Sequence, residues 1–437
     1  MGLLIGVGNT KPTFPYDYYY GIEWDASAAS SACTRIGRTE LHQTLPIQSK
    51  MRRCILNDSG VVVTYLNVNN STLTDSGAKA DLSGASGQVM VEIPAHYRKF
   101  ENEGTVFRCL LSEHALPGFT FVPKAYRSAY EASVDRTTAT AKLASVVNTT
   151  AAFRGGNNDA SKDGTFKSLL GKPATVLSLT QFRSYARNRG NAGLNNAGWN
   201  CDVYEVQKTC YWLYCVEYAN FNCQLDYNAA SDANGYKQGG LGKGVSDLSN
   251  WDLFGYYPVI NCGATNSLGN KTGYVEVSVA KSDDSSVAAQ TMQVPSYRGL
   301  ENPFGHVWSW TDGCKVRIQA ASTSDFYVCT NPVNFQDTDY TNYEKRGELA
   351  LSGGWIKSLL VGEYGENMPL TVGGGSTTYF ADYFYTSIPG SGESQRGVPF
   401  GGDASFGAYD GLSCAAASYA PSYRYALIGS RLCFLPA

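Results

Sequence analysis

Alternating apolar and polar positions in the first third of the chain predict short strands joined by loops. Residues 60–68 (GVVVTYLNV) follow a turn and are rich in β-branched residues. In residues 88–100 (QVMVEIPAHYRKF), Val89, Val91 and Ile93 fall on one face of a second strand. The segments GFTFVP and AYRSAYEAS extend the pattern to about residue 133.

Two middle segments have helical periodicity instead. In residues 177–190 (LSLTQFRSYARNRG), Ser178 and Gln181 have capping-box spacing and Gly190 ends the pattern. In residues 201–221 (CDVYEVQKTCYWLYCVEYANF), Asp202 and Glu205 are spaced like an N-cap pair. An apolar stripe runs along this second segment through Val206, Cys210, Leu213 and Phe221. We expect both helices to pack on a sheet.

From about residue 225 onward, glycine-rich and polar loops broken by short apolar pieces replace regular patterning. Residues 236–247 (YKQGGLGKGVSD) resemble a phosphate loop, but Gly244 follows Lys243 where Ser or Thr is needed, so we reject a nucleotide site. Residues 413–427 (SCAAASYAPSYRYAL) have neither helical nor strand period. The pattern as a whole predicts an α+β protein whose N-terminal region, residues 1–87, is small and mostly β.

Composition excludes two classes of partner. A net charge of −3 over 437 residues provides no basic stripe for nucleic acid. No apolar run approaches the roughly 18 residues of a membrane span. The start, MGLLIGVGNTKP, has neither the positive flank nor the cleavage site of a signal peptide, so we expect synthesis in the cytosol without membrane insertion. The 30 tyrosines and 46 glycines instead resemble the composition of binding loops.

Cysteine and histidine give no metal or redox motif. The 12 cysteines lack paired short spacings, and the four histidines lie far apart in sequence. We expect buried free thiols, no disulfides, and no cofactor.

A glycine–aromatic motif carries a resemblance to a known fold. Residues 297–313 (YRGLENPFGHVWSWTDG) contain Gly305, Val307, Trp308 and Trp310 in the order G-x-V-W-x-W. This resembles the core strand of the C-type-lectin fold in its formylglycine-generating-enzyme-like form. RGVPFGG (396–402) and IGSRLCF (428–434) resemble later strands of the same fold. The resemblance implies a lectin-like domain at 88–437, with 1–87 serving attachment or oligomerisation.

Fold alone does not fix function, and two alternatives follow from this resemblance. A copper-dependent oxidase of the formylglycine-generating type would carry two cysteines where this chain has Phe406 and Gly411, so we expect no enzyme. A calcium-dependent glycan-binding lectin would use carboxylates such as Glu301 and Asp312, but two are too few for the oxygen-rich site that calcium prefers.

The whole chain, including IEWDAS, TRIGRTELHQTLPIQSKMR and VVNTTAAFRGGNN, resembles the variable proteins of diversity-generating retroelements, especially phage tail-fibre proteins. The resemblance implies a receptor-binding adhesin whose terminal segment is rewritten by adenine-directed mutagenesis. It implies a host cell-surface protein or glycan as ligand, a homotrimer, other tail proteins as partners, and a place in the virion tail.

A check on this hypothesis is the absence of Lys, Glu, Gln, Met and Trp from residues 401–431, since codons randomised at two positions with a pyrimidine third cannot encode them. A tyrosine- and serine-rich loop with no special origin stays the alternative. Substitution is tolerable only where side chains contribute little to folding, so the variable segment, about 403–427, is expected to face solvent. The predicted ligand-binding residues are Asp403, Ser405, Phe406, Tyr409, Asp410, Ser413, Cys414, Ala416, Tyr419, Tyr423, Arg424, Tyr425 and Leu427.

The frame behind this segment is expected to be apolar. Trp308, Trp310 and other large residues near them would form the core, and Arg431 would bind a buried carboxylate or carbonyl group. The other predicted anchors are Phe304, Ile428, Leu432 and Phe434.

Overall fold

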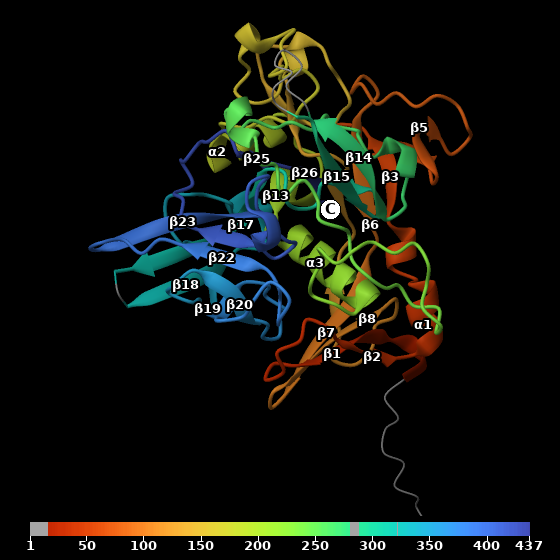
Figure 1. The fold of residues 1–437 in the computed structure, drawn as a ribbon, viewed down its shortest axis with the longest axis vertical. Helices are drawn as coiled ribbons and strands as arrows, with labels where there is room; N and C mark the ends of the chain where they lie inside the picture. The colour runs from red at the N-terminus through yellow and green to blue at the C-terminus, as the bar shows by residue number, and fades with distance from the viewer. Residues whose placement is uncertain (1–15, 280–287, 321) are drawn as a thin grey trace, which may run out of the picture.

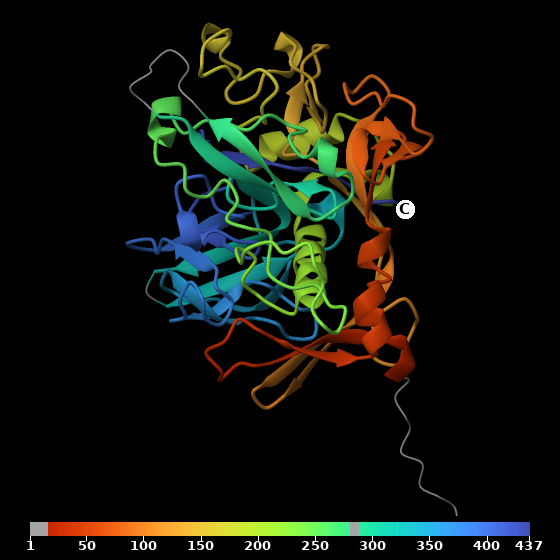
Figure 2. The ribbon, with the colours of Figure 1, turned by 45° about the vertical axis from the view of Figure 1, so that its right-hand side comes forward.

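The computed structural model describes residues 16–279, 288–320 and 322–437, and the expectation for the start of the chain falls outside these ranges. The described part is mostly β-structure. The smaller of its two large sheets has five strands and lies at the bottom of Figures 1 and 2. In spatial order the strands are β2 (Thr34–Gly37), β1 (Tyr20–Asp25), β8 (Val106–Ser112), β7 (His96–Glu103) and β9 (Thr120–Val122).

A second network of strand pairing runs through most of the described chain. It joins β21 (Pro369–Val372), β20 (Gly354–Leu359), β22 (Tyr383–Thr386), β24 (Ala415–Ala417), β23 (Glu393–Phe400), β17 (Trp308–Gln319), β13 (Trp199–Val203), β26 (Leu432–Phe434), β10 (Ala125–Ser128), β6 (Gln88–Ile93), β3 (Arg52–Leu56), β4 (Val62–Asn67) and β5 (Asn70–Thr74). Strands β18 (Thr323–Val328), β19 (Glu344–Glu348) and β25 (Ile428–Ser430) attach beside this path. Separate small sheets contain β11 (Ser133–Asp135) with β12 (Lys142–Ala144), and β14 (Gly273–Val279), β15 (Gln290–Tyr297) and β16 (Leu300–Glu301).

Helix α2 (Leu179–Arg187) forms as its sequence predicts. The Ser178 hydroxyl accepts a hydrogen bond from the Gln181 backbone N–H, and the Gln181 side chain accepts from the Ser178 N–H, which completes the capping box. Phe182 and Ala186 turn inward toward β13 and β17. The short α1 (Thr39–Thr44) precedes β3.

Helix α3 (Tyr204–Tyr218) forms, but its predicted N-cap and its predicted apolar stripe are wrong. Asp202 lies in β13 rather than at the N-cap, because its carboxylate is held by the buried Arg127 guanidinium at 2.5 and 2.9 Å. Every residue of α3 except Glu205 is buried, since the helix runs through the centre of the molecule with structure on both sides (Figure 2). A helix buried all round has no single apolar stripe.

The strand predictions are confirmed in part. Residues 60–68 contain β4, but residues 88–100 form two strands, because the chain leaves β6 at Pro94 and enters the five-stranded sheet as β7. Loops are expected after residue 225, and residues 226–272 do form turns and short 3₁₀ helices without a named strand. From residue 273 the expectation of loops is wrong, since strands return, and the 12-residue β17 lies where the fold resemblance predicts a core strand. This strand is buried on both faces and therefore does not alternate.

Strand pairing crosses the predicted boundary at residue 87 in both large sheets. β1 pairs with β8, and β3 pairs with β6 along the register Arg52↔Glu92. One continuous hydrophobic core contains residues from Tyr20 to Cys433. Residues before and after 87 therefore share the same sheets and core, rather than forming two separately folded units.

The predicted core anchors are buried. Trp308 and Trp310 project from β17 and are 1% and 0% exposed. Phe304, Ile428, Leu432 and Phe434 are also buried. Arg431 is buried and donates to the backbone carbonyls of Ser128, Glu301 and Asn302, so its partners are carbonyl groups. All 12 cysteines are free thiols, and only Cys33 is part-exposed.

Candidate functional site

The predicted binding residues separate into an outer and an inner group. Eight are exposed or half-exposed: Ser405, Phe406, Tyr409, Tyr419, Tyr423, Arg424, Tyr425 and Leu427. The other five, Asp403, Asp410, Ser413, Cys414 and Ala416, are at most 1% exposed. The expectation that the whole set faces solvent is therefore wrong for these five.

The loop of residues 418–427, called the tyrosine loop below, is attached to the frame through its backbone. The carbonyl of Tyr419 accepts from the Gly397 N–H at 3.0 Å, and the carbonyl of Tyr425 accepts from the Val176 N–H at 3.1 Å. The carbonyls of Pro421 and Leu427 accept from the backbone N–H groups of Leu179 and Trp308 at 3.0 and 2.9 Å. Side chains of this loop make no hydrogen bonds to the described residues. Its path therefore depends little on the identity of its exposed side chains.

Three tyrosines of this loop form a stack. The Tyr419 and Tyr423 rings lie 4.6 Å apart at an interplanar angle of 8°, and Tyr423 and Tyr425 lie 5.9 Å apart at 22°. Tyr423 and Tyr425 are 38% and 41% exposed, whereas Tyr419 packs partly on the core beside Trp308. Stacking restricts the ring torsions before any ligand binds, which reduces the entropic cost of binding.

A second row of aromatic side chains lies beside strand β24. Tyr385 of β22 stacks on Phe406 at 4.9 Å, and Tyr383 contacts Tyr409 at 4.8 Å. Trp355 of β20 completes the row at 5.0 Å from Tyr409. Trp355, Tyr383 and Tyr385 are not among the ligand-binding residues predicted from the sequence. The alternation Tyr383-Phe384-Tyr385, with a fully buried Phe384, is the signal that places both tyrosines on one outer face.

The five buried residues belong to the frame because their side chains have polar partners inside it or pack in its core. The Asp403 carboxylate accepts from the Trp308 indole N–H at 3.0 Å and from the Ser405 hydroxyl at 2.7 Å. Ser413 donates its N–H and hydroxyl to Asp382 at 2.7 and 2.8 Å. Cys414, which precedes β24, and Ala416, the central residue of that strand, belong to the same hydrophobic cluster as Trp308. Random substitution at these positions would strand buried polar groups or create cavities.

Three carboxyl groups lie buried under the aromatic surface. Burial raises the pKa of Asp382 to about 7, although the hydrogen bonds from Ser413 oppose the shift. Burial also raises the pKa of Asp403. The pKa of Asp410 lies well above its usual value because of burial and the neighbouring Asp403 charge. Burial thus shifts the protonation equilibrium of each of these carboxyl groups toward the protonated form.

We expect Asp382→Asn to remove a pH-dependent part of the stability. Folded Asp382 keeps its proton up to about pH 7, whereas the unfolded chain loses it near pH 3.8. The wild-type free energy of unfolding should therefore fall relative to the variant as pH rises from 5 to 8, by about 2 kcal/mol. Burial lowers the pKa of His42 and His96 to about 4, so these groups make the free energy of unfolding rise with pH. Their contribution is the same in both proteins and cancels when the two free energies of unfolding are subtracted.

Urea unfolding of both proteins at pH 5, 6, 7 and 8 measures this difference. The exposed Asp252→Asn is the matched control and should show a constant difference from wild type. A constant difference for Asp382→Asn as well would contradict the raised pKa.

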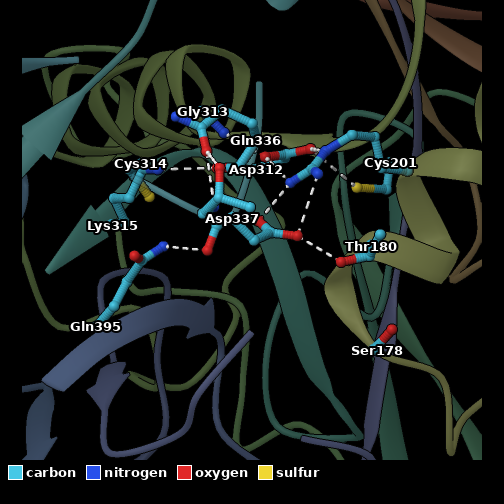
Figure 3. Close-up of polar contacts among 12 residues, drawn as sticks. Ser178, Thr180, Cys201, Asp312, Gly313, Cys314, Lys315, Gln336, Asp337 and Gln395 are labelled. Carbon is cyan, nitrogen blue, oxygen red and sulfur yellow. Dashed lines mark hydrogen bonds and ion pairs between the residues drawn. The ribbon is translucent and has the colours of Figure 1, made fainter. Parts of the chain in front are cut away.

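An ion-pair network fixes α2, the helix whose first residue binds the tyrosine loop (Figure 3). Arg183 donates to both Asp312 oxygens at 2.5 and 3.0 Å and to both Asp337 oxygens at 2.7 and 3.1 Å. Thr180 and Gln395 also donate to Asp337, through its carboxylate and its backbone carbonyl respectively. The network links α2 to β17 and to the loop after η8 (Pro332–Asn334).

The residues considered for calcium or thiol chemistry have partners inside the protein. Glu301 is buried and accepts from the Gly263 and Thr265 backbone N–H groups, and Asp312 is held by Arg183. Burial raises the pKa of the Cys414 and Cys433 thiols well above the usual value, which opposes formation of the nucleophilic thiolate. Within the described ranges, no group of three His, Cys, Asp or Glu side chains has the arrangement of a metal site.

Comparisons with known proteins give few matches. No family model matches the sequence, and no curated protein matches it. A search of solved structures finds "Major Tropism Determinant U1 Variant" at 12% identity and a TM-score of 0.25. That match covers 71% of this chain and 50% of the other, so it spans about half the length of that protein. No helix in the described part has the length and apolar character needed to cross a membrane.

Proposed function

We propose that this chain is a receptor-binding adhesin of a phage tail, with a C-type-lectin-like fold that presents the tyrosine loop to a host-surface protein or glycan. The backbone attachment of this loop is the observation that supports the proposal. Hydrogen bonds from Gly397, Val176, Leu179 and Trp308 hold the loop whatever its side chains are. Such an attachment suits a surface that a retroelement diversifies.

The proposal narrows the variable contact surface to the eight outward residues named above. Tyrosine and arginine at the centre of an interface commonly supply most of its binding energy. The stacked tyrosines, with the exposed Arg424 between two of them in sequence, provide this combination. We place Asp403, Asp410, Ser413, Cys414 and Ala416 in the constant frame. The proposed chemistry is noncovalent recognition without a catalytic step or cofactor.

A trimer in the virion tail, bound to other tail proteins, completes the proposal. Several linked copies would raise avidity by roughly 10²–10⁴ without any new contact at each site. Light scattering of the full chain measures the assembly, and a monomeric mass would contradict this part alone.

Replacing the two most exposed tyrosines tests the central claim. We expect the double variant Tyr423→Ser/Tyr425→Ser to bind host cells about 100-fold more weakly, because two aromatic contacts of about 1–2 kcal/mol each are removed. Its free energy of unfolding should change by less than about 2 kcal/mol, since only ring stacking is lost. The measurement is adsorption of the labelled full chain to a panel of bacterial isolates, selected for binding the wild type.

Tyr18→Ser/Tyr256→Ser is the matched control, because these rings are 51% and 39% exposed and lie in other parts of the fold. This variant should adsorb like the wild type. Equal adsorption by both double variants would refute the tyrosine loop as the binding surface. Unfolding of Tyr423→Ser/Tyr425→Ser would refute the claim that the frame does not depend on these side chains.

A further inference from the structure

A groove of about 610 Å³ lies outside the tyrosine loop and the aromatic row. It is formed by the start of β3, the turn between β4 and β5, the segment after η7 (Asn266–Leu268) and the turn between β15 and β16. No residue that follows Arg298 in the sequence lines the groove, so the lining includes none of the predicted ligand-binding residues. Strands β3 and β5 lie at the right of Figure 1, whereas β23 lies at the left. The volume falls within the range of roughly 300–1,000 Å³ that is usual for small-molecule sites.

The groove is lined by more positive than negative side chains. Lys50, Arg52, Lys271 and Arg298 line the groove together with one carboxylate, Glu92. Glu113 and Asp75 pair with Lys50 and Arg52, but Lys271 is exposed and has no acidic partner among the described residues.

Arg298 is fixed in position with part of its guanidinium unused. Its Nε and Nη2 donate to the buried Glu217 carboxylate at 2.6–3.1 Å, and no described group accepts from Nη1. Its backbone has φ of 50°, as the two-residue turn between β15 and β16 requires at this position. The groove therefore combines one cation held by an ion pair and one exposed cation without an acidic partner among the described residues.

The remaining lining is polar and suits hydroxyl groups. Asn69 and Asn270 bring side-chain amides, and the Asn270 Oδ1 is already used by the Arg53 N–H, which leaves its NH₂ as donor. Glu92 accepts from Tyr65 and Tyr126 through Oε2, which leaves Oε1 as acceptor. The lining contains no aromatic ring on which a nucleobase could stack.

We propose that this groove is a second ligand site that binds an acidic saccharide. The carboxylate or sulfate of the sugar accepts hydrogen bonds from Lys271 and from the Arg298 Nη1–H. Sugar hydroxyls donate to Glu92 Oε1 and accept from the asparagine amides. The site is independent of the tyrosine loop and of its proposed role.

Calorimetric titration of the full chain with 3′-sialyllactose, a sulfated lactose and neutral lactose tests the proposal. We expect one or both acidic sugars to bind at least about tenfold more tightly than lactose, and comparison of the two identifies the carboxylate or the sulfate as the preferred group. Lys271→Glu should weaken that binding about tenfold or more and leave the melting temperature unchanged, because the lysine has no partner to lose.

Lys243→Glu is the matched control, since Lys243 is exposed and does not line the groove. It should change the affinity by less than about twofold. The proposal is overturned if neither acidic sugar binds the wild type at millimolar concentration, if lactose binds as tightly, or if the two variants behave alike.

Discussion

Arg183→Met is expected to lower the free energy of unfolding by about 3–5 kcal/mol. The substitution leaves the buried Asp312 without its cation, and an uncompensated buried charge is costly. Among the described residues, Asp312 would keep the Gly313 N–H at 2.8 Å and a long contact from the Cys201 thiol at 3.9 Å. Asp337 is 18% exposed and can gain water instead. Chemical denaturation with fluorescence detection measures the change.

A second variant separates the lost charge pair from lost packing. Arg183→Met/Asp312→Asn removes both charges of the buried pair and should be more stable than Arg183→Met alone. Arg108→Met is the control in a more exposed network, where Arg108, Glu23 and Glu103 are 25%, 32% and 78% exposed, and it should cost less than about 1 kcal/mol. Equal losses at Arg183 and Arg108 would show that the network in Figure 3 does not stabilise the frame.

Gly402→Ala is expected to cost about 3–4 kcal/mol. A Cβ at this position would lie 1.6 Å from Asp410 Oδ1, and that oxygen accepts from the Asp403 N–H at 3.1 Å. Asp410 is buried and can move only by breaking this bond, so overpacking adds to the cost of φ at 81°. The expected result is a large fall in the midpoint of thermal unfolding.

Gly407→Ala is the matched control in the same segment. Its φ is 57°, but an added Cβ would meet only the Ser246 carbonyl at 3.9 Å. Backbone strain alone should then cost about 1–2 kcal/mol. If the two alanine variants were equally stable, the tight packing of Gly402 on Asp410 would be contradicted.

Arg183 and Gly402 belong to the frame, and the frame affects binding because the tyrosine loop is attached to it. Arg183 fixes α2, whose Leu179 N–H holds Pro421, while Asp403 and Asp410 lie beneath Phe406 and Tyr409. Frame variants should therefore reduce both stability and host adsorption. Substitution of the exposed Tyr423 and Tyr425 should change adsorption much more than stability. This separation distinguishes the two groups of residues experimentally.

Local pattern determined several features that the structure retains. Ser178 and Gln181 form their capping box because both partners lie within one helical turn. This feature depends on neighbours a few residues away, so the sequence carries it directly. Trp308 and Trp310 are buried, and Tyr423 and Tyr425 are exposed, as the resemblance of their segments to known families implies.

Tertiary structure decided the features whose partners are distant in the chain. Asp202 left its predicted cap for Arg127, 75 residues away, and Ser413 turned inward to Asp382. Tyr383 and Tyr385 lie beside the terminal segment because β22 pairs with β24, and Trp355 joins them because β20 pairs with β22. Lys271 and Arg52 line one groove because separate turns converge there. Burial of a polar group depends on whether a partner is available after folding, and a linear pattern does not contain that information.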